Sequence, residues 1–310
     1  VTYVSDTQWG AKLIVSGTIG GVCGIMKNTG DYVDIIGFDM TYAPQGVCAL
    51  GLLQDGNYGR IMGNRVHDLT GPDGTGVGGI IVDCCVYTKT GNQVIGNVVD
   101  NIGPPNGGSN LIHGIYLAGP GNSAVNNIVT RASAACISSY HGATRLIISN
   151  NVLTNCGRYG ITISADSVDV PGGNDSTTVS NNIVVNNGQF GIQEYCEPHS
   201  QGPARVGSNN MYYNNIVYNN PGGHIQHCDG DASNEDSTIV LTSAAFAALF
   251  VNYTGDMSGD YHLRAGAVAI DRGTTRCAPG VTTCAPSTAF DGVRRPQGTA
   301  WDIGAYEFIP

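Results

Sequence analysis

The sequence contains little charge, and only a small part of that charge is basic. Lys and Arg together number 14 among 310 residues, Asp and Glu number 24, and the net charge is −10. Because a protein that binds nucleic acid needs a basic surface, this composition argues against a nucleic-acid partner. The sequence also lacks any apolar run near the roughly 20 residues that span a bilayer, so we expect no membrane span.

Disorder and zinc binding are disfavoured on similar grounds. Charged residues make up 12% of the chain and hydrophobic residues 41%, whereas disordered chains combine low hydrophobicity with high charge. The ten cysteines include no pair of CxxC motifs at zinc-ligand spacing. So many cysteines favour an oxidising compartment, and we expect a secreted or cell-surface protein. Cys277 and Cys284 bracket a short loop and are predicted to form a disulfide.

A repeat runs through most of the sequence and decides the fold class. Six Asn residues recur at intervals of 33, 30, 24, 31 and 33 residues, each followed two positions later by an apolar residue. They are Asn64, Asn97, Asn127, Asn151, Asn182 and Asn215, and Phe38 holds the same place in a weaker earlier copy. Alternation with a period of two is typical of a β-strand. We expect these Asn side chains to form a structural ladder at a corner of each repeat.

A second column begins another short strand in each repeat. Its members are Gly79, Gly114, Cys136, Gly160, Gly191 and His224. The next residue is always Ile, namely Ile80, Ile115, Ile137, Ile161, Ile192 and Ile225. We expect these Ile side chains to stack inside the molecule as a ladder.

The two columns predict an all-β protein, a right-handed parallel β-helix of about seven stacked coils. A left-handed hexapeptide helix is disfavoured because its coils hold near 18 residues, and the template of leucine-rich repeats is absent. Residues 1–230 are predicted to form the coils. Residues 231–310 lose the repeat and are predicted to form an irregular C-terminal cap of the same domain, since an open solenoid end exposes unpaired strand edges.

Several segments resemble one known family. The opening VTYVSDTQWGAKLI, the strands HGIYL and GIQEY, and FDGVRRPQGTAWDIGAYEF at 290–308 are similar to the pectate-lyase-like right-handed β-helix repeat proteins. The last segment resembles the C-terminal segment of bacterial secreted and surface members. The resemblance implies the β-helix fold and export. Members of such families begin with an N-terminal capping region, and we expect this sequence to start after it.

Loop lengths indicate which face of the solenoid binds a ligand. Long insertions flank the strands of the second column in the first two and the later coils, and the coils at Gly114 and Cys136 have short loops. We therefore expect a trough along this column, with its floor between Tyr116 and Arg145. The predicted substrate-binding residues are His113, Asp83, Ser138, Thr162, Ser164, Gln193, Tyr195 and Lys89. Aromatic rings and hydroxyl groups of this kind suit a polysaccharide.

The predicted catalytic group consists of His141, Tyr116, Tyr140 and Arg145. β-Elimination of a uronate needs a cation near the carboxylate, a base for the C5 proton and an acid for the leaving oxygen. Arg145 could supply the cation, His141 the base, and Tyr116 or Tyr140 the acid.

Two further pairs of residues fall close together on neighbouring coils. Asp166 and Glu197 could form the carboxylate pair of a hydrolase, could bind Ca²⁺, or could be ordinary charged residues of a loop. Ca²⁺ is the one cofactor that we consider. Glu194 and His227 fall on the inward parity and are expected to pair structurally. Cys196 and Cys228 are predicted to form a second disulfide.

These features leave three functions open. The first is a secreted polysaccharide lyase that cleaves a uronic-acid polymer. The second is a glycoside hydrolase that uses Asp166 and Glu197. The third is a non-catalytic surface β-helix that binds glycans or only packs. Each implies a polysaccharide or surface partner, and we expect a monomer. Fold alone does not choose among them.

Overall fold

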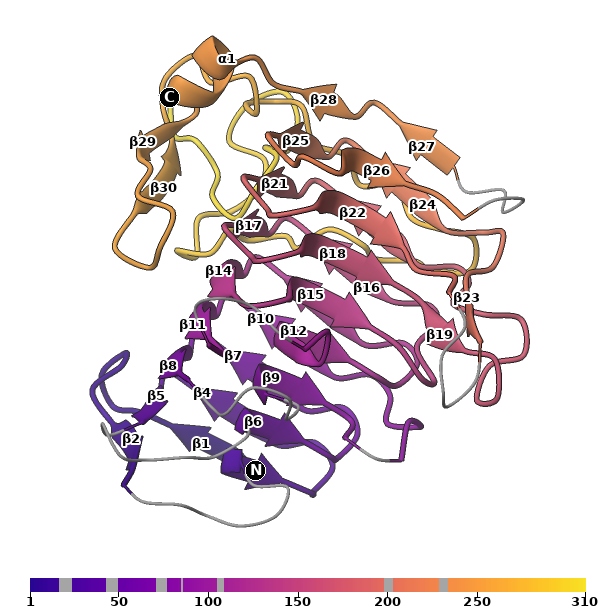
Figure 1. Cartoon of the computed structure of the whole chain (residues 1–310). Helices are drawn as coiled ribbons and strands as arrows, with labels where there is room; N and C mark the ends of the chain where they lie inside the picture. Colours follow the sequence, from indigo (N-terminus) through magenta and orange to yellow (C-terminus); the bar gives the residue numbers. More distant parts are fainter. Residues whose placement is uncertain are drawn as a thin grey trace.

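The computed structural model describes residues 1–16, 24–42, 50–70, 77–84, 86–104, 109–197, 203–228 and 234–310. Over these residues the chain winds into stacked coils whose strands form three parallel sheets of nine, nine and eight strands (Figure 1). This is the predicted right-handed parallel β-helix. Parts of the predicted long loops, at 71–76, 105–108 and 198–202, lie outside the described residues.

The three sheets are named A, B and C, in the order in which a coil passes through them. Sheet A contains β1 (Thr2–Val4), β4 (Asp34–Ile36), β7 (Arg60–Met62), β10 (Gln93–Ile95), β13 (Ser123–Val125), β16 (Ile147–Ser149), β20 (Thr178–Ser180), β24 (Met211–Tyr213) and β27 (Asn234–Asp236). Sheet B contains β2 (Lys12–Val15), β5 (Asp39–Tyr42), β8 (Arg65–Leu69), β11 (Val98–Ile102), β14 (Ile128–Ala132), β17 (Val152–Thr154), β21 (Ile183–Val185), β25 (Ile216–Tyr218) and β28 (Ile239–Val240). Sheet C contains β3 (Gly24–Asn28), β6 (Leu50–Gln54), β9 (Val77–Val82), β12 (Ile112–Leu117), β15 (Ala135–Ser139), β18 (Tyr159–Ile163), β22 (Phe190–Glu194) and β26 (Gly223–Gln226).

The predicted Ile ladder is confirmed in sheet C. The six Ile residues from Ile80 to Ile225 are aligned from strand to strand. The first five are fully buried, and Ile225, near the end of the stack, is partly buried. Sheet B contributes Val99, Val129 and Val184 to the same core. The Ile ladder therefore holds sheet C in register and directs the alternate side chains outward.

The predicted Asn ladder lies between sheets A and B. The six Asn residues are fully buried, and each Oδ1 accepts the backbone N–H of the residue at the same place in the preceding coil. The first such bond reaches the N–H of Phe38, in the weaker copy. The residue before each ladder Asn has a positive φ and is Gly or Asn, as a left-handed corner requires.

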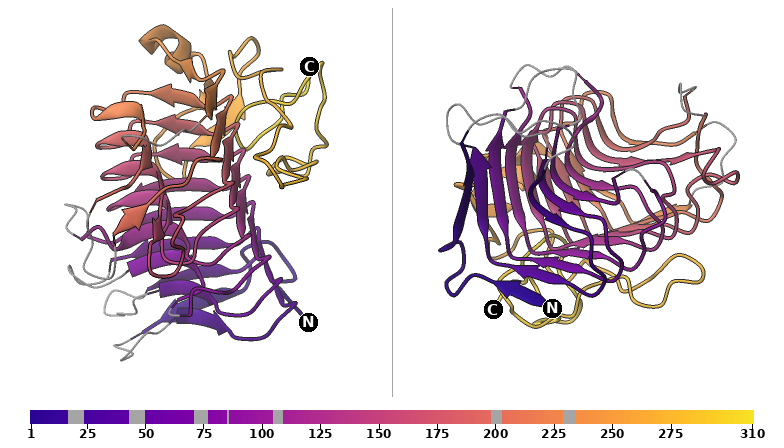
Figure 2. Two further views of the ribbon diagram at one scale, coloured as in Figure 1. Left: turned by 90° about the vertical axis from the view of Figure 1, so that its right-hand side faces the viewer. Right: turned by 90° about the horizontal axis from the view of Figure 1, so that it is seen from below.

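The C-terminal residues pack along the outer face of sheet B rather than only over the end of the solenoid (Figure 2). Phe250, Tyr261 and Ile303 join a cluster with outward residues of β14, β17, β21 and β25, such as Ile128 and Ile183. This segment contains α1 (Ser243–Ala247) and the antiparallel pair β29 (Phe250–Asn252) and β30 (Asp260–Leu263). Another antiparallel pair, β19 (Ala165–Asp166) and β23 (Ala204–Arg205), extends a loop beyond sheet C. Among the described residues, no helix has the length and apolar character needed to cross a membrane.

Candidate functional site

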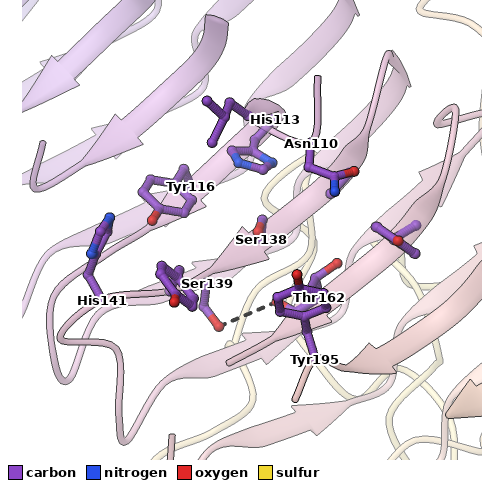
Figure 3. Close-up of a pocket in the computed structure, with 12 residues that line it drawn as sticks. Asn110, His113, Tyr116, Ser138, Ser139, His141, Thr162 and Tyr195 are labelled. Carbon is purple, nitrogen blue, oxygen red and sulfur yellow. Dashed lines mark hydrogen bonds between the residues drawn. The ribbon is translucent and has the colours of Figure 1, made fainter. Parts of the chain in front are cut away.

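A pocket lies on the outer face of sheet C, over the middle coils, and opens to solvent (Figure 3). Seven predicted site residues line it, namely His113, Tyr116, Ser138, Tyr140, His141, Thr162 and Tyr195. The other lining residues are Asn110, Leu111, Ala135, Ser139 and Tyr159. The structure thus brings together most of the residues selected from alternation along one strand column.

Strand alternation explains how these side chains reach the pocket. Tyr116, Ser138 and Thr162 follow the buried Ile by one residue and are aligned on β12, β15 and β18. Because the preceding Ile points into the core, this column must point outward. His113 and Tyr159 lie three residues before Tyr116 and Thr162 on the same strands, and they also line the pocket. Alternation does not account for these two, because it is interrupted at Gly114 and Gly160, where a Cβ would meet the core residues Val129 and Val184. The pocket floor is therefore fixed by rigid, paired strands rather than by loops.

One end of the pocket contains a stack of rings at the corner that follows sheet C. The ring of Tyr87 stacks on the imidazole of His141, with centroids 3.7 Å apart and an interplanar angle of 10°. Tyr140 meets the same imidazole edge to face, at 4.9 Å and 65°. His141 has a φ of 55°, a conformation unusual for a residue other than Gly or Asn. These contacts hold the imidazole in one orientation at the pocket wall.

The Tyr87 turn depends on Asp83, which corrects the prediction that Asp83 contacts substrate. Asp83 is fully buried, and its carboxylate accepts the backbone N–H groups of Val86, Tyr87 and Lys89. The prediction failed because β9 ends at Val82 and Asp83 has a φ of 65°, so strand alternation no longer applies. Lys89 lies in this turn and is not among the residues lining the pocket.

Burial disfavours the charged forms of Tyr116, Tyr140 and His113 in the pocket. Burial raises the pKa of Tyr116 well above its usual value, and nearby Tyr87 and Tyr140 add to the effect. Burial, followed by the charge of Asp166, raises the pKa of Tyr140 to about 12. Burial lowers the pKa of His113, whose ring stacks on Tyr116 at 5.0 Å, to about 4. At neutral pH the pocket therefore offers phenolic proton donors and a neutral imidazole at His113.

Carboxylates approach the His141 end of the pocket. His141 Nδ1 lies 3.7 Å from Asp169 Oδ2, and potential ligand atoms of His141, Asp166 and Asp169 all lie within 4.8 Å of one another. Asp166 is 2% exposed, and its Oδ1 accepts the N–H of Val168 at 2.7 Å. The predicted partner Glu197 is exposed and is not a member of this group. The predicted metal or hydrolase pair is therefore replaced by a group of one imidazole and two carboxylates.

This donor set suits some metals better than others. An imidazole with two carboxylates fits Zn²⁺ or Mn²⁺, which accept mixed nitrogen and oxygen ligands. Ca²⁺ takes six to eight oxygen ligands, and these side chains would supply only two carboxylates. None of the described residues that line the pocket is Lys or Arg.

Three other predicted residues lie away from the pocket. Arg145 is exposed at the corner between sheets C and A, with a φ of 53°, and lines a separate hollow with Asp175 and Arg205. It was grouped with His141 by closeness in sequence, but the chain has left sheet C after Ser139. Ser164 is fully buried just past the end of β18, and its hydroxyl donates to the carbonyl of Tyr195 at 2.7 Å. Gln193 on β22 is aligned with the pocket residue Thr162, but it is not among the residues that line the pocket.

Disulfides and the buried pair agree with the sequence-based predictions. Cys196 and Cys228 are bonded, and so are Cys277 and Cys284. A third disulfide, between Cys136 and Cys156, was not predicted because both residues lie within strand or corner positions that apolar side chains also occupy. Glu194 is buried and lies 3.5 Å from His227 Nδ1, as expected for a structural pair.

Comparison with solved structures gives similar folds. An alginate lyase from Paenibacillus sp. strain FPU-7 aligns with a TM-score of 0.58 and 20% identity, over 78% of this chain and 80% of that chain. A pectate lyase aligns with a TM-score of 0.46 and 12% identity, over 97% of this chain and 89% of that chain. The A-module of a mannuronan C-5 epimerase from Azotobacter vinelandii aligns with a TM-score of 0.37 and 14% identity, over 70% of this chain and 65% of that chain.

The first of these likenesses shows the fold, and the other two add no argument. No family model matches the sequence, and no curated protein matches it. The chain shares the parallel β-helix architecture of the alginate lyase at an identity too low to carry over its reaction.

Proposed function

We propose that this protein is a polysaccharide lyase that cleaves a uronic-acid-containing polymer by β-elimination in the pocket on sheet C. The observation that carries the proposal is the meeting of His141, Tyr116 and Tyr140 in one pocket on a rigid sheet face. These side chains can supply the base and the acid that elimination needs. The likeness to the alginate lyase fold agrees with this reaction.

The roles are assigned from the chemistry of the side chains that meet in the pocket. As the base, the imidazole of His141 would take the C5 proton, the C4–O bond would break, and a C4–C5 double bond would form. Because the raised pKa of Tyr116 and that of Tyr140, about 12, keep both phenols protonated, either can donate a proton to the leaving oxygen. Proton and bond balance close without water, which distinguishes this reaction from hydrolysis.

The carboxylate of the substrate also needs a positive charge nearby. Arg145 lies in the separate hollow, so we no longer assign it this role. The group of His141, Asp166 and Asp169 could hold a divalent cation, which would offset the substrate carboxylate. With a cation present, His141 would be a ligand, and the base would then be one of the other pocket groups, with the neutral imidazole of His113 the nearest in type.

The cellular location and the partner of the protein are part of the same proposal. Three disulfides among the described residues support an oxidising, extracellular compartment. The acidic composition and the polar, aromatic pocket support a polysaccharide partner rather than nucleic acid. We expect the protein to act as a monomer.

The proposal is tested by incubating the protein with a panel of polyuronates, with and without added divalent cations. We expect unsaturated products, seen by their ultraviolet absorbance. His141→Ala should abolish product formation and leave the circular dichroism spectrum unchanged. His262→Ala is a matched control, since His262 lies in the C-terminal segment between Asp260 and Asp291 and should not affect turnover.

Other products would support the other functions. New reducing ends without ultraviolet absorbance would indicate a hydrolase. Glycan binding without any product would indicate a non-catalytic surface protein. Either result would contradict the lyase proposal.

A further inference from the structure

Two polar atoms on the outward column of sheet C are buried without a partner. Thr162 and Gln193 are each 7% exposed, and neither Thr162 Oγ1 nor Gln193 Oε1 makes a hydrogen bond. Buried polar atoms in folded proteins are nearly always hydrogen-bonded, and leaving one unpaired costs about 1–3 kcal/mol. Two unpaired atoms on one surface therefore point to a partner that the chain itself does not supply.

The two residues lie side by side. Thr162 on β18 is aligned with Gln193 on β22, the next strand of sheet C. The Gln193 amide is fixed, because its Nε2 donates to Gln226 Oε1 at 2.8 Å. This bond leaves Oε1 as the unpaired acceptor. Thr162 lines the pocket, so a bound group there can reach its hydroxyl (Figure 3).

An aromatic wall stands beside these atoms on the same two strands. Tyr159 and Phe190 lie three residues before Thr162 and Gln193, and their rings stack with centroids 6.5 Å apart and an interplanar angle of 15°. Tyr159 lines the pocket, and at the same place on β15 the small Ala135 leaves room next to it. An apolar ring face beside hydroxyl and amide groups is the arrangement that binds a pyranose.

The charges around the pocket restrict which sugar fits. The described lining residues include no Lys or Arg, and Asp166 and Asp169 are near enough to raise the pKa of the pocket residue Tyr140. A carboxylate held at Thr162 and Gln193 would meet no counter-charge and would lose hydration, which is costly. A sugar that presents only hydroxyl groups would satisfy both unpaired atoms without this cost.

We propose that Thr162, Gln193 and Tyr159 form a subsite for an uncharged sugar residue, next to the reacting groups along the solenoid axis. The inference rests on the proposed function, because it takes the neighbouring part of the pocket to be the place where the uronate reacts. It names the substrate class as a heteropolysaccharide in which a neutral sugar flanks the uronate. Successive coils are about 4.8 Å apart, so the step from Tyr116 to Thr162 spans about two coils, the scale of one to two sugar residues.

The decisive variant is Thr162→Val, which removes the hydroxyl and keeps the shape of the side chain. We would measure binding calorimetrically with hyaluronan and gellan oligosaccharides, in which neutral sugars accompany glucuronate, and with oligogalacturonate. We expect tighter binding of at least one of the mixed oligosaccharides than of oligogalacturonate. Thr162→Val should weaken that binding about three- to tenfold, the value of one hydrogen bond.

The thermal midpoint of unfolding gives a second readout, and we expect it to change in the opposite direction to glycan affinity. Because Thr162 Oγ1 is unpaired without ligand, Thr162→Val should raise the thermal midpoint while it lowers affinity. The control is Thr154→Val on sheet B. Thr154 Oγ1 bonds Tyr253 Oη at 2.7 Å, so its loss should lower the midpoint and leave glycan affinity unchanged.

The outcomes separate the subsite from the lyase proposal. Unchanged affinity in Thr162→Val, or no binding of either mixed oligosaccharide, would overturn the subsite. If Thr162→Val weakens glycan binding but the protein forms no unsaturated product, the subsite is supported and the proposed lyase reaction is contradicted.

Discussion

The Asn ladder makes a quantitative prediction for Asn127→Ala. The Oδ1 atom of Asn127 accepts the backbone N–H and the Nδ2 group of Asn97, at 2.9 and 3.0 Å. Its own Nδ2 donates to the carbonyl of Val94 at 2.9 Å and to Asn151 Oδ1 at 3.0 Å. All of these groups are buried, and Asn127 does not have a positive φ, so Ala fits the backbone there.

Four hydrogen bonds are lost in this variant, and their effects differ. The N–H of Asn97 is left buried without its acceptor, which costs about 1–3 kcal/mol. The other three groups retain or can find further partners, and each loss costs about 0.5–1.5 kcal/mol. We therefore expect the free energy of unfolding to fall by about 2.5–7.5 kcal/mol, since the ladder carries bonds between three successive coils.

The assay is equilibrium denaturation in guanidinium chloride, followed by circular dichroism. Asn209→Ala is the matched control, because Asn209 is exposed and bonds only the carboxylate of Asp175 through its side chain. That control should change the free energy of unfolding by about 0.5 kcal/mol or less. A loss below about 1 kcal/mol for Asn127→Ala would refute the view that the ladder is a main stabilising element.

Two further predictions concern the C-terminal segment and the last coils. Glu307→Ala should lower the free energy of unfolding by about 3–5 kcal/mol. The reason is that the buried guanidinium of Arg295 loses the Glu307 carboxylate, whose Oε2 lies 2.8 Å from Arg295 Nη1. An unchanged denaturation midpoint would contradict this. The hydrogen bond to Glu194 raises the pKa of His227, so its stabilisation is fully present below the unfolded pKa, about 6.5, and is lost as pH rises through the raised value. Stability measured against pH should show this decline in the wild type and lack it in His227→Gln; identical profiles would exclude the pair as its source.

The fold could be predicted because the structural constraints repeat in every coil. Each left-handed corner needs Gly or Asn, and each ladder Asn bonds its counterpart, so Asn97 and Asn127 carry the same signal. The stack also includes strands at its two ends, such as β1 and β27, whose coils lack the repeated Asn. The position of the C-terminal segment along sheet B was not predictable, since its residues follow no repeat.

The site could be predicted only where strand alternation holds. Tyr116, Ser138 and Thr162 lie within strands, and the structure places all three on the pocket floor. Asp83 and Ser164 lie one residue past a strand end, where the backbone turns and the parity is lost. Tyr87 reaches His141 from a turn and left no periodic signal.

Another pocket residue, Tyr159, is misplaced by simple alternation. Tyr159 directly precedes the Gly160 of the second column, as His113 precedes Gly114 and Phe190 precedes Gly191. Because Tyr159 and the inward Ile161 are two residues apart, strict alternation would place both on the inner face. A Cβ at Gly160 would itself meet the core residue Val184, so the alternation is interrupted at the Gly and does not predict the outward position of Tyr159.

The central claim is that the pocket breaks a glycosidic bond by elimination, without water. The most direct measurement is mass spectrometry of the products formed from a uronate-containing polysaccharide in water enriched in the heavy oxygen isotope. The account predicts products whose masses sum to that of the substrate with no added water, that carry an unsaturated end, and that disappear in His141→Ala. Saturated products that have together gained one water containing the heavy oxygen would contradict it.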